Sequence, residues 1–407
     1  MLTLLAPAIL RSVIELPCGL IPTRNEKTGK LILIIKIHKE YILAAQIKGG
    51  FSFYLAPLQS SSGLTAALAT AFFDNEDEPL LIKTPLLFDD QFSRDILELL
   101  SYKELEVYFF DELGREWLGY LASVSDKLSL LATGTGFKLL AYHEHTVNDI
   151  HRCLNIWFAN RTPKDDANAI RVVFVNELFP QDIVRLDCRP GDHDYNGSDP
   201  YSFTQLVKGN AGYFQERDII ACLKRSFRGE QLFINPFRRD NGKEFVDVLA
   251  ANDGDLLFIQ AKDSPNTKVS LSRTIPRKRN TSHSQIEKGI NQVKGAAAYI
   301  HKQSNLELRV GDSNIDIELR SKKIIGVLVI QELFIDEGVA FVERYREMNG
   351  LVDVFALLDY AAFFSFCYVF HDEHQLLKAF ADYSAKILSE GIWIAPQTYV
   401  FNFGLKD

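Results

Sequence analysis

Three polar side chains interrupt two apolar runs in the second half of the chain, and their residue types could carry out metal-dependent chemistry. Asp247 lies inside the run "KEFVDVLAAN", while Gln260 and Lys262 lie near the end of "LLFIQAKDS". Because side chains alternate along a strand, we expect Gln260 and Lys262 on one face. A buried ammonium group is costly unless an anion lies beside it. The Asp247 carboxylate is the anion that the sequence offers.

The elements around these residues decide whether the three side chains can meet. The sequence "NDGD", residues 252–255, separates the two runs and predicts the turn of a β-hairpin. A short turn brings the end of the second strand close to the middle of the first. We therefore expect Asp247, Gln260 and Lys262 to surround one point.

A helix predicted over residues 212–229 adds a second carboxylate. Its sequence is "GYFQERDIIACLKRSFRG", and Gly229 is expected to end it. Glu216 heads an apolar stripe with helical spacing, and such a stripe faces the core. The stripe continues through Ile219, Ile220, Leu223 and Phe227. We therefore expect Glu216 to point toward the sheet, where it could converge with Asp247.

Such convergence would gather hard oxygen ligands around one place. Glu216, Asp247, the Gln260 amide and the Ala261 carbonyl together suit Mg²⁺ or Mn²⁺. A divalent metal would polarise a phosphoryl oxygen and lower the pKa of a bound water molecule. Lys262 would orient that water or stabilise the pentavalent charge. The pattern predicts hydrolysis of a phosphodiester.

The order of these features resembles a known family. A helix, a strand, a strand with Q-A-K and a further helix are similar to the PD-(D/E)xK nuclease superfamily, which has the restriction-endonuclease-like fold. The Q-x-K form resembles the subset that includes Mrr-type restriction enzymes. The resemblance covers roughly residues 205–335. It implies that Asp247 is the motif aspartate, Gln260 the middle residue and Lys262 the motif lysine.

The resemblance also implies a glutamate in the first helix, and Glu216 matches that position, with Glu244 as the alternative. The sequence departs from the family pattern at two places. Val246 stands where the motif proline would be. Gln260 replaces an acidic residue, which leaves one negative charge fewer to hold a metal.

Positive charge is concentrated directly after the Q-A-K strand. Between residues 264 and 300, seven basic residues accompany the single acid Glu287, in a chain whose formal net charge is −8. The stretch "SRTIPRKRNTSHS" predicts a mobile loop that would close over nucleic acid, because cationic groups neutralise phosphates. The residues expected to contact nucleic acid are Lys268, Arg273, Arg277, Lys278, Arg279, Lys288 and Gln292.

Each of these features also has a simpler interpretation. Asp247 could be a strand-end acid held by backbone amides. Gln260 and Lys262 could mark the end of an ordinary edge strand, with the Lys262 ammonium group extended into water. Glu216 could be a solvated acid favoured by the helix dipole. The clusters "HEHTVNDIHRC" and "GDHDYNGSD" contain metal-ligand residue types, but their spacings match neither a zinc pair nor a calcium loop.

Composition favours a globular protein. The chain has 407 residues, of which 47% are hydrophobic and 24% charged. Its five scattered cysteines favour a reducing compartment over a disulfide framework.

The stretch "LVDVFALLDYAAFFSFCYVF" contains Asp353 and Asp359, which argue against a membrane span. We therefore expect a soluble, cytoplasmic protein without a membrane partner.

We expect an α/β (α+β) fold, with residues 206–407 as a restriction-endonuclease-like mixed sheet flanked by helices. Residues 1–145 are predicted to form a separate mixed α+β domain for recognition or for a partner, either a second copy or a defence complex. Residues 146–205 are predicted to connect the two, with the buried strand "AIRVVFVNELF" and the loop "RPGDHDYNGSDP".

Local patterns predict the individual elements. In the first domain we expect strands in "KLILIIKIHKEYILAAQI", helices at "SGLTAALATAFF" and "FSRDILELLSY", and a hairpin at "KELEVYFFDELGREWLGYLASV". In the last domain we expect a long helix at "SHSQIEKGINQVKGAAAYIHK", buried strands at "KKIIGVLVIQEL" and "FFSFCYVF", and a closing helix at "DEHQLLKAFADYSAKILSEG".

The sequence thus predicts a Mg²⁺- or Mn²⁺-dependent endonuclease with DNA as its expected substrate, in restriction, antiphage defence or repair. The alternative is a non-catalytic subunit that binds nucleic acid or protein on a degenerate nuclease fold. The glutamine at position 260 keeps this alternative open.

Overall fold

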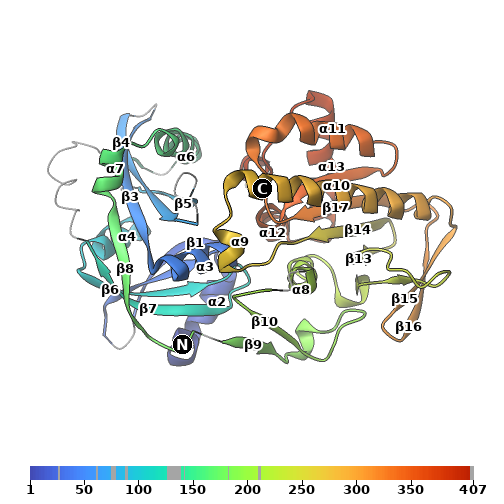
Figure 1. The fold of residues 1–407 in the computed structure, drawn as a ribbon, viewed down its shortest axis with the longest axis horizontal. Coiled ribbons are helices and arrows are strands. Elements are labelled where there is room, and N and C mark those ends of the chain that lie inside the picture. Colours follow the sequence, from blue (N-terminus) through green and yellow to red (C-terminus); the bar gives the residue numbers. More distant parts are fainter. Residues whose placement is uncertain are drawn as a thin grey trace. The chain divides into compact units, whose positions relative to one another are not determined.

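The computed structural model of the protein describes residues 1–403 apart from 26–27, 61–62, 75–78, 88–89, 126–138, 142, 182 and 210–211. The described chain forms two units. Unit 1 comprises Met1–Ile183 and Asn266–Ser272, and unit 2 comprises Val184–Pro265 and Arg273–Asp407. Figure 1 labels the elements of both units. The expected mixed α+β class is confirmed, since both units combine sheets with helices.

Unit 1 is built on an eight-stranded mixed sheet in the order β1-β2-β6-β7-β8-β3-β4-β5. Its strands are β1 (Gly19–Arg24), β2 (Leu31–Lys36), β3 (Gly50–Ser60), β4 (Gly63–Phe72), β5 (Leu80–Pro85), β6 (Glu104–Phe110), β7 (Glu116–Val124) and β8 (Ile170–Glu177). Its helices are α1 (Leu2–Leu5), α2 (Ala8–Glu15), α3 (Lys39–Lys48), α4 (Gln91–Leu100), α6 (Glu144–Ala159), α7 (Pro163–Asn168) and α9 (Lys268–Leu271). Helix α6 packs on β3, β4 and β5.

Local patterns in unit 1 predict some elements correctly and others wrongly. Helix α4 and the β6–β7 hairpin are confirmed, and Asp90 caps α4 by accepting from the N–H groups of Phe92 and Ser93. The predicted helix "SGLTAALATAFF" is wrong, because this segment is strand β4. The alanines of β4 are buried, so close packing in the sheet outweighs their helix propensity. The strand predicted through residue 47 ends at Lys36, and α3 follows.

Strand β8 joins unit 1 although it follows residue 145. It pairs antiparallel with both β3 and β7, so unit 1 includes part of the predicted connecting segment. The prediction of a strand here is confirmed, but it is not a fully buried one. Val173 and Val175 are exposed on one face, since the strand alternates between core and solvent.

Unit 2 is built on a five-stranded sheet in the order β11-β13-β14-β17-β18. Strands β11, β13 and β14 are antiparallel, whereas β14, β17 and β18 run parallel to one another. These strands are β11 (Leu232–Ile234), β13 (Val248–Ala251), β14 (Asp255–Lys262), β17 (Lys323–Ile330) and β18 (Val354–Asp359). Two smaller sheets accompany them, made of β9 (Val184–Asp187) with β10 (Ser202–Gln205), and of β12 (Phe237–Arg238), β15 (Asn305–Val310) and β16 (Ser313–Glu318).

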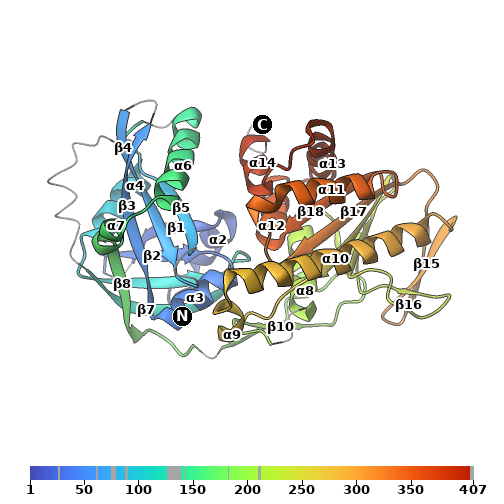
Figure 2. The same cartoon turned by 45° about the horizontal axis from the view of Figure 1, so that its top comes forward.

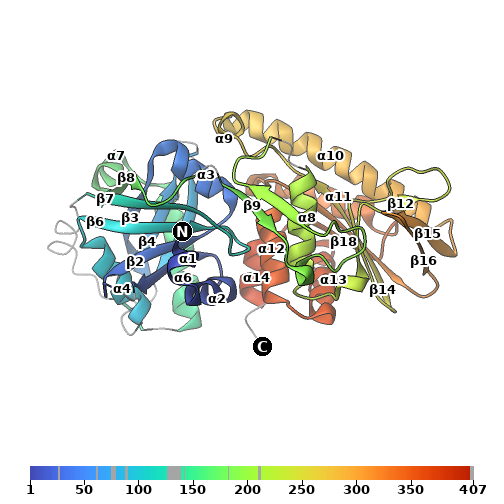
Figure 3. The same cartoon turned by 90° about the horizontal axis from the view of Figure 1, so that it is seen from below.

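Helices cover both faces of the five-stranded sheet. The helices of unit 2 are α8 (Gly212–Leu223), α10 (Ile275–Ile300), α11 (Gly338–Met348), α12 (Tyr360–Val369), α13 (Glu373–Glu390) and α14 (Pro396–Phe403). Figures 2 and 3 show α10 and α8 on opposite faces of the sheet. Helix α11 lies on the α10 side, where the Tyr345 hydroxyl accepts a bond from the Leu357 N–H at 3.0 Å. Helix α13 packs against the edge strand β18.

Three predictions in unit 2 are wrong in part. The expected mobile loop "SRTIPRKRNTSHS" is mostly the start of α10, because Pro276 stands in the first turn, where a proline costs no hydrogen bond. The expected strand "FFSFCYVF" belongs to α12, whose first turn is capped by Asp359. Helix α8 ends at Leu223, earlier than the predicted Gly229. The expected strands β14 and β17 and the closing helix α13 are confirmed.

The cysteines and the longest apolar stretch take ordinary places in the protein. All five cysteines are free, as the sequence predicts. The stretch with Asp353 and Asp359 forms β18 and α12 of the core. Among the described residues, none of the helices is long and apolar enough to cross a bilayer.

We expect Gly289→Ala to destabilise unit 2, because α10 approaches β17 closely at this point. A Cβ atom at Gly289 would lie 2.3 Å from Cδ1 of Leu328, so helix or strand must shift. The expected loss is about 1–3 kcal/mol in the free energy of unfolding, measured by urea denaturation. Gly295 on the same helix has open space around its Cβ position, so Gly295→Ala should be neutral or stabilise by up to about 1 kcal/mol. Equal effects of the two variants would contradict this account of the packing.

Candidate functional site

Asp247 directly precedes β13, because the strand predicted at "KEFVDVLAAN" begins only at Val248, whereas Gln260 lies within β14 as predicted. Val248 pairs with Ile259, the residue before Gln260, and Asp247 and Gln260 line one cavity. At the other end of the β13–β14 hairpin, Oδ1 of Asn252 accepts bonds from the N–H groups of Gly254 and Asp255, at 2.8 and 2.6 Å, and fixes the turn. The short covalent path through this turn sets the spacing of the two polar side chains.

The Asp247 carboxylate lies between a backbone amide and the ammonium group of Lys262. Its Oδ2 accepts a bond from the Ala261 N–H at 2.6 Å and lies 3.5 Å from Nζ of Lys262. Burial raises the pKa of Asp247, and the nearby Lys262 and Ala261 N–H only partly oppose that effect. The structure therefore brings Asp247 and Lys262 together, and it surrounds the carboxylate with little water.

A cavity of about 180 Å³ opens beside Asp247 and Gln260, and Lys262 is not among the residues that line it. It is lined by Arg238, Glu244, Phe245, Asp247, Gln260, Gln292, Gly295 and Ala296. The two small residues of α10 form part of its wall and leave room that larger side chains would fill. The cavity thus collects side chains from β12, the hairpin and α10.

Gln260 contributes a buried oxygen that lacks a partner. The side chain is only 2% exposed, and no described group donates to its Oε1. Leaving a buried acceptor unpaired costs on the order of 1–3 kcal/mol, so such an atom calls for an explanation. A cation beside Asp247 would satisfy this oxygen.

Glu216 lies near this site but does not line the cavity. Its Oε2 accepts a bond from Nδ2 of Asn235 at 3.0 Å, and the backbone N–H of Asn235 donates to the Asp247 carbonyl at 2.9 Å. Burial, together with the negative charges of Asp247 and Glu244, raises the pKa of Glu216 to about 7. Glu216 is thus coupled to Asp247 electrostatically and reaches it through Asn235.

Glu244, the alternative to Glu216, does line the cavity. Partial burial raises its pKa, and the Asp247 carboxylate raises it further, whereas Lys262 lowers it. Within the described residues, however, no three His, Cys, Asp or Glu side chains lie close enough to hold a metal ion together. A metal here would be held by at most two carboxylates, those of Asp247 and Glu244, together with neutral oxygens.

Such a donor set fits Mg²⁺, which retains several waters and binds through one or two carboxylates plus phosphates of a substrate. Asp247 supplies the carboxylate, and Gln260 supplies the unpartnered amide oxygen. The Ala261 carbonyl, another of the four predicted ligands, accepts a bond from Nζ of Lys262 at 2.8 Å. A carbonyl oxygen has two lone pairs, so this bond leaves one position for a metal.

The structure separates the residues that the sequence assigned to nucleic-acid contact. Gln292 lines the cavity, and Lys288 lies exposed one turn earlier on α10. Arg279 instead pairs with Asp336 and Glu337 at 2.8 and 3.1 Å. Lys268 belongs to α9 of unit 1, Arg273 precedes α10 in unit 2, and Arg277 and Lys278 lie in the first turn of α10.

Asn235 and Arg238 are site residues that sequence reasoning missed. Asn235 has a positive φ of 47°, which an asparagine tolerates better than most residues, and its buried Oδ1 lacks a partner among the described groups. Arg238 reaches the cavity because Phe237 pairs with Glu244 and folds the intervening chain back. No spacing rule in the sequence predicts this return.

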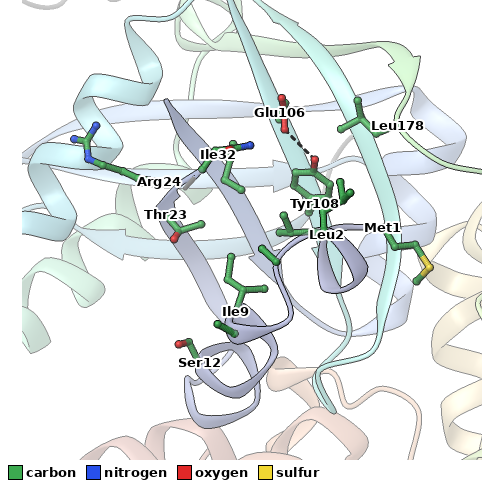
Figure 4. Close-up of a pocket in the computed structure, with 14 residues that line it drawn as sticks. Met1, Leu2, Ile9, Ser12, Thr23, Arg24, Ile32, Glu106, Tyr108 and Leu178 are labelled. Atoms are coloured by element: carbon green, nitrogen blue, oxygen red, sulfur yellow. Dashed lines mark hydrogen bonds between the residues drawn. The ribbon is translucent and has the colours of Figure 1, made fainter. Parts of the chain in front are cut away.

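A larger cavity, of about 460 Å³, lies in unit 1 beside α1 and α2 (Figure 4). Its charged side chains are engaged in pairs. Arg24 lies 3.2 Å from both Asp95 and Glu98, and the Tyr108 hydroxyl donates to Glu106 at 2.9 Å. The rest of its lining is largely apolar, so this cavity offers less chemistry than the hairpin site.

We expect Glu216→Gln to reduce the dependence of stability on pH. The pKa of Glu216 rises from 4.5 to about 7 on folding, so the folded protein binds a proton that the unfolded chain releases within this range. The wild-type free energy of unfolding should therefore fall as the pH rises from 4.5 to 7, by roughly 1–2 kcal/mol from this group after solvent screening.

Urea denaturation between pH 4 and pH 8 measures this effect. The curve for Glu216→Gln should be flatter than the wild-type curve by that amount. The exposed Glu318 provides the control, and Glu318→Gln should leave the curve unchanged. Parallel curves for wild type and Glu216→Gln would contradict the assignment of a shifted carboxyl at this position.

Searches against protein-family models, curated proteins and solved structures find no match to this chain.

Proposed function

We propose that this protein is a divalent-metal-dependent endonuclease that hydrolyses phosphodiester bonds in DNA, and that unit 2 has a restriction-endonuclease-like fold. One observation carries the proposal. The buried Gln260 Oε1 lacks a partner and lines a cavity with the Asp247 carboxylate, 3.5 Å from which lies the Lys262 ammonium. A hydrated Mg²⁺ or Mn²⁺ would satisfy the amide oxygen and offset the buried negative charge.

In this proposal each side chain has a distinct role. Asp247 and Gln260 hold the cation together with the Ala261 carbonyl, and Glu216 supports Asp247 electrostatically through Asn235. The cation supplies Lewis acidity and an acidified water. Lys262 orients the attacking water and stabilises the charge that develops on the phosphoryl oxygens.

The wider setting is part of the same proposal. Gln292, Lys288 and the basic start of α10 contact the DNA backbone. The free cysteines agree with a reducing compartment, which we take to be the cytoplasm. Restriction, antiphage defence or repair are the settings proposed for this activity, with unit 1 as the recognition or partner unit.

A second candidate function rests on Gln260. With an amide where the PD-(D/E)xK nucleases that it resembles carry an acid, and without a third close ligand carboxylate among the described residues, the unit could bind nucleic acid or protein without cleaving it. Isothermal calorimetry with Mn²⁺ separates the two candidates. Binding that Asp247→Asn removes supports the nuclease, and absence of such binding supports the non-catalytic subunit.

The decisive experiment is a cleavage assay with the full chain. Linear, covalently closed circular and single-stranded DNA are incubated with Mg²⁺, Mn²⁺ or EDTA, and RNA is tested in parallel. We expect nicking of circular DNA with either metal and none with EDTA. Absence of cleavage of every DNA form, in a protein that also fails to bind Mn²⁺, would overturn the proposed function.

A further inference from the structure

We infer that Arg238 binds a phosphate group of the nucleic acid next to the reacting one, and this inference rests on the proposed function. Arg238 lies at the end of β12 and lines the same cavity as Asp247 and Gln260. An arginine presents a planar fork of donors that matches phosphate. Arg238 lines the same cavity as the carboxyl groups of Glu244 and Asp247 but forms an ion pair with neither, which suggests a different anionic partner.

The hydrogen bonds of Arg238 leave this fork open. Its Nε lies 3.3 Å from Oδ1 of Asp240, and this is its one ion pair within the described part of the chain. Neither Glu244 nor Asp247 forms an ion pair with it, although both line the cavity. The two terminal nitrogens therefore remain available to a further anion.

Packing holds the guanidinium in place before any ligand arrives. The group lies over the ring of Tyr299, 4.1 Å from its centroid, and the side chain is 24% exposed. Stacking and the Asp240 contact restrict the rotamers of a flexible side chain. A fork that is ordered in advance loses less entropy when it binds a phosphate.

The size of the cavity indicates which kind of anion it accepts. Cavities that enclose a complete small-molecule ligand usually measure about 300–1,000 Å³, whereas this one measures about 180 Å³. It suits a phosphate group with a hydrated cation, carried by a larger molecule that stays outside. A nucleic-acid strand presents such phosphates at regular intervals.

The chain offers a matched control for this inference in the next residue. Arg239 pairs with Glu307 at 2.8 Å and with Asp316 at 2.6 Å, and it does not line the cavity. Arg238→Gln and Arg239→Gln therefore remove the same charge one residue apart. Arg238→Lys retains the charge but loses the fork, and thermal melting confirms that each variant folds.

The test measures binding of a fluorescent DNA duplex with Ca²⁺ in place of Mg²⁺, over a range of salt concentrations. We expect Arg238→Gln to weaken binding about tenfold and to lower the slope of log K against log salt by about 0.9, the loss of one phosphate contact. Arg238→Lys should recover the slope but only part of the affinity, and Arg239→Gln should match the wild type.

The outcomes separate this inference from the proposed function. Suppose that wild type binds and cleaves DNA while Arg238→Gln has the wild-type affinity and the wild-type slope of log K against log salt. This result would overturn the assignment of Arg238 but would leave the proposed nuclease function unaffected. Equal losses in Arg238→Gln and Arg239→Gln would also overturn it, because they indicate a general charge effect. If wild type neither binds nor cleaves DNA, both proposals fail together.

Discussion

Asp247→Asn and Lys262→Met should each lower the metal-dependent cleavage rate at least about 10³-fold. Lewis-acid and electrostatic stabilisation of the transition state contribute several kcal/mol, and each 1.36 kcal/mol corresponds to a factor of about ten. Asp247→Asn keeps an oxygen that can accept the Ala261 N–H bond, now formed at 2.6 Å. Lys262→Met keeps the apolar stem and removes only the ammonium group.

Single-turnover rates with Mg²⁺ and Mn²⁺ provide the measurement, and melting curves show whether the fold survives. Loss of a buried charge at Asp247 should cost little stability, because burial raises the pKa of this carboxyl and so disfavours its ionised form. The exposed Lys302 serves as the control for loss of positive charge. Full activity in folded Lys262→Met protein would remove the lysine from the mechanism.

Gly295→Phe should block the site without unfolding the protein. Gly295 lines the cavity, and a Cβ atom placed on it meets no heavy atom within 4 Å. A phenylalanine can therefore be introduced without a backbone clash, and its ring would occupy much of a space of about 180 Å³. We expect cleavage to fall at least about 10²-fold, since displacement of the reacting groups by about 1 Å already costs that much.

The same helix carries a suitable control for the obstruction. Ala298 is exposed and does not line the cavity, so Ala298→Phe adds a ring of equal size elsewhere on α10. Calorimetry with Mn²⁺ and cleavage of circular DNA are compared for both variants. Normal activity in Gly295→Phe, or equal losses in the two variants, would show that this cavity is not where the reaction occurs.

Local sequence was sufficient to predict that Asp247 lies beside Lys262, because the hairpin is a local structure. The turn at Asn252 and the alternation of β14 place Asp247, Gln260 and Lys262 with few alternatives. The position of Arg238 depends on the pairing of β12 with β15 and on packing against Tyr299, and that of Asn235 on its bond to Glu216, and no spacing in the sequence reveals these contacts. Glu216 lies between these cases, since its helix was predictable but its bond to Asn235 was not.

The errors in the predicted fold have similar causes. "FFSFCYVF" is apolar on every side, a property that a buried helix shares with a buried strand. The Asp359 side chain favours the helix, because it accepts a bond from the Ala362 N–H and caps the first turn of α12. In β4, neighbouring strands bury a run of alanines that would favour a helix in isolation. At Pro276, a residue that usually interrupts a helix occupies its first turn instead.

The route of the chain after β14 limits how the protein can be divided. β14 ends at Lys262, the chain contributes Asn266–Ser272 to unit 1, where α9 packs against α3, and it re-enters unit 2 at Arg273 to begin α10. Residues 1–183 alone would therefore lack the α9 segment of unit 1, and the rest of the chain would carry that segment without its packing partner α3. An exchange of unit 1 between proteins would therefore have to include Asn266–Ser272, which lies between two segments of unit 2 in the sequence.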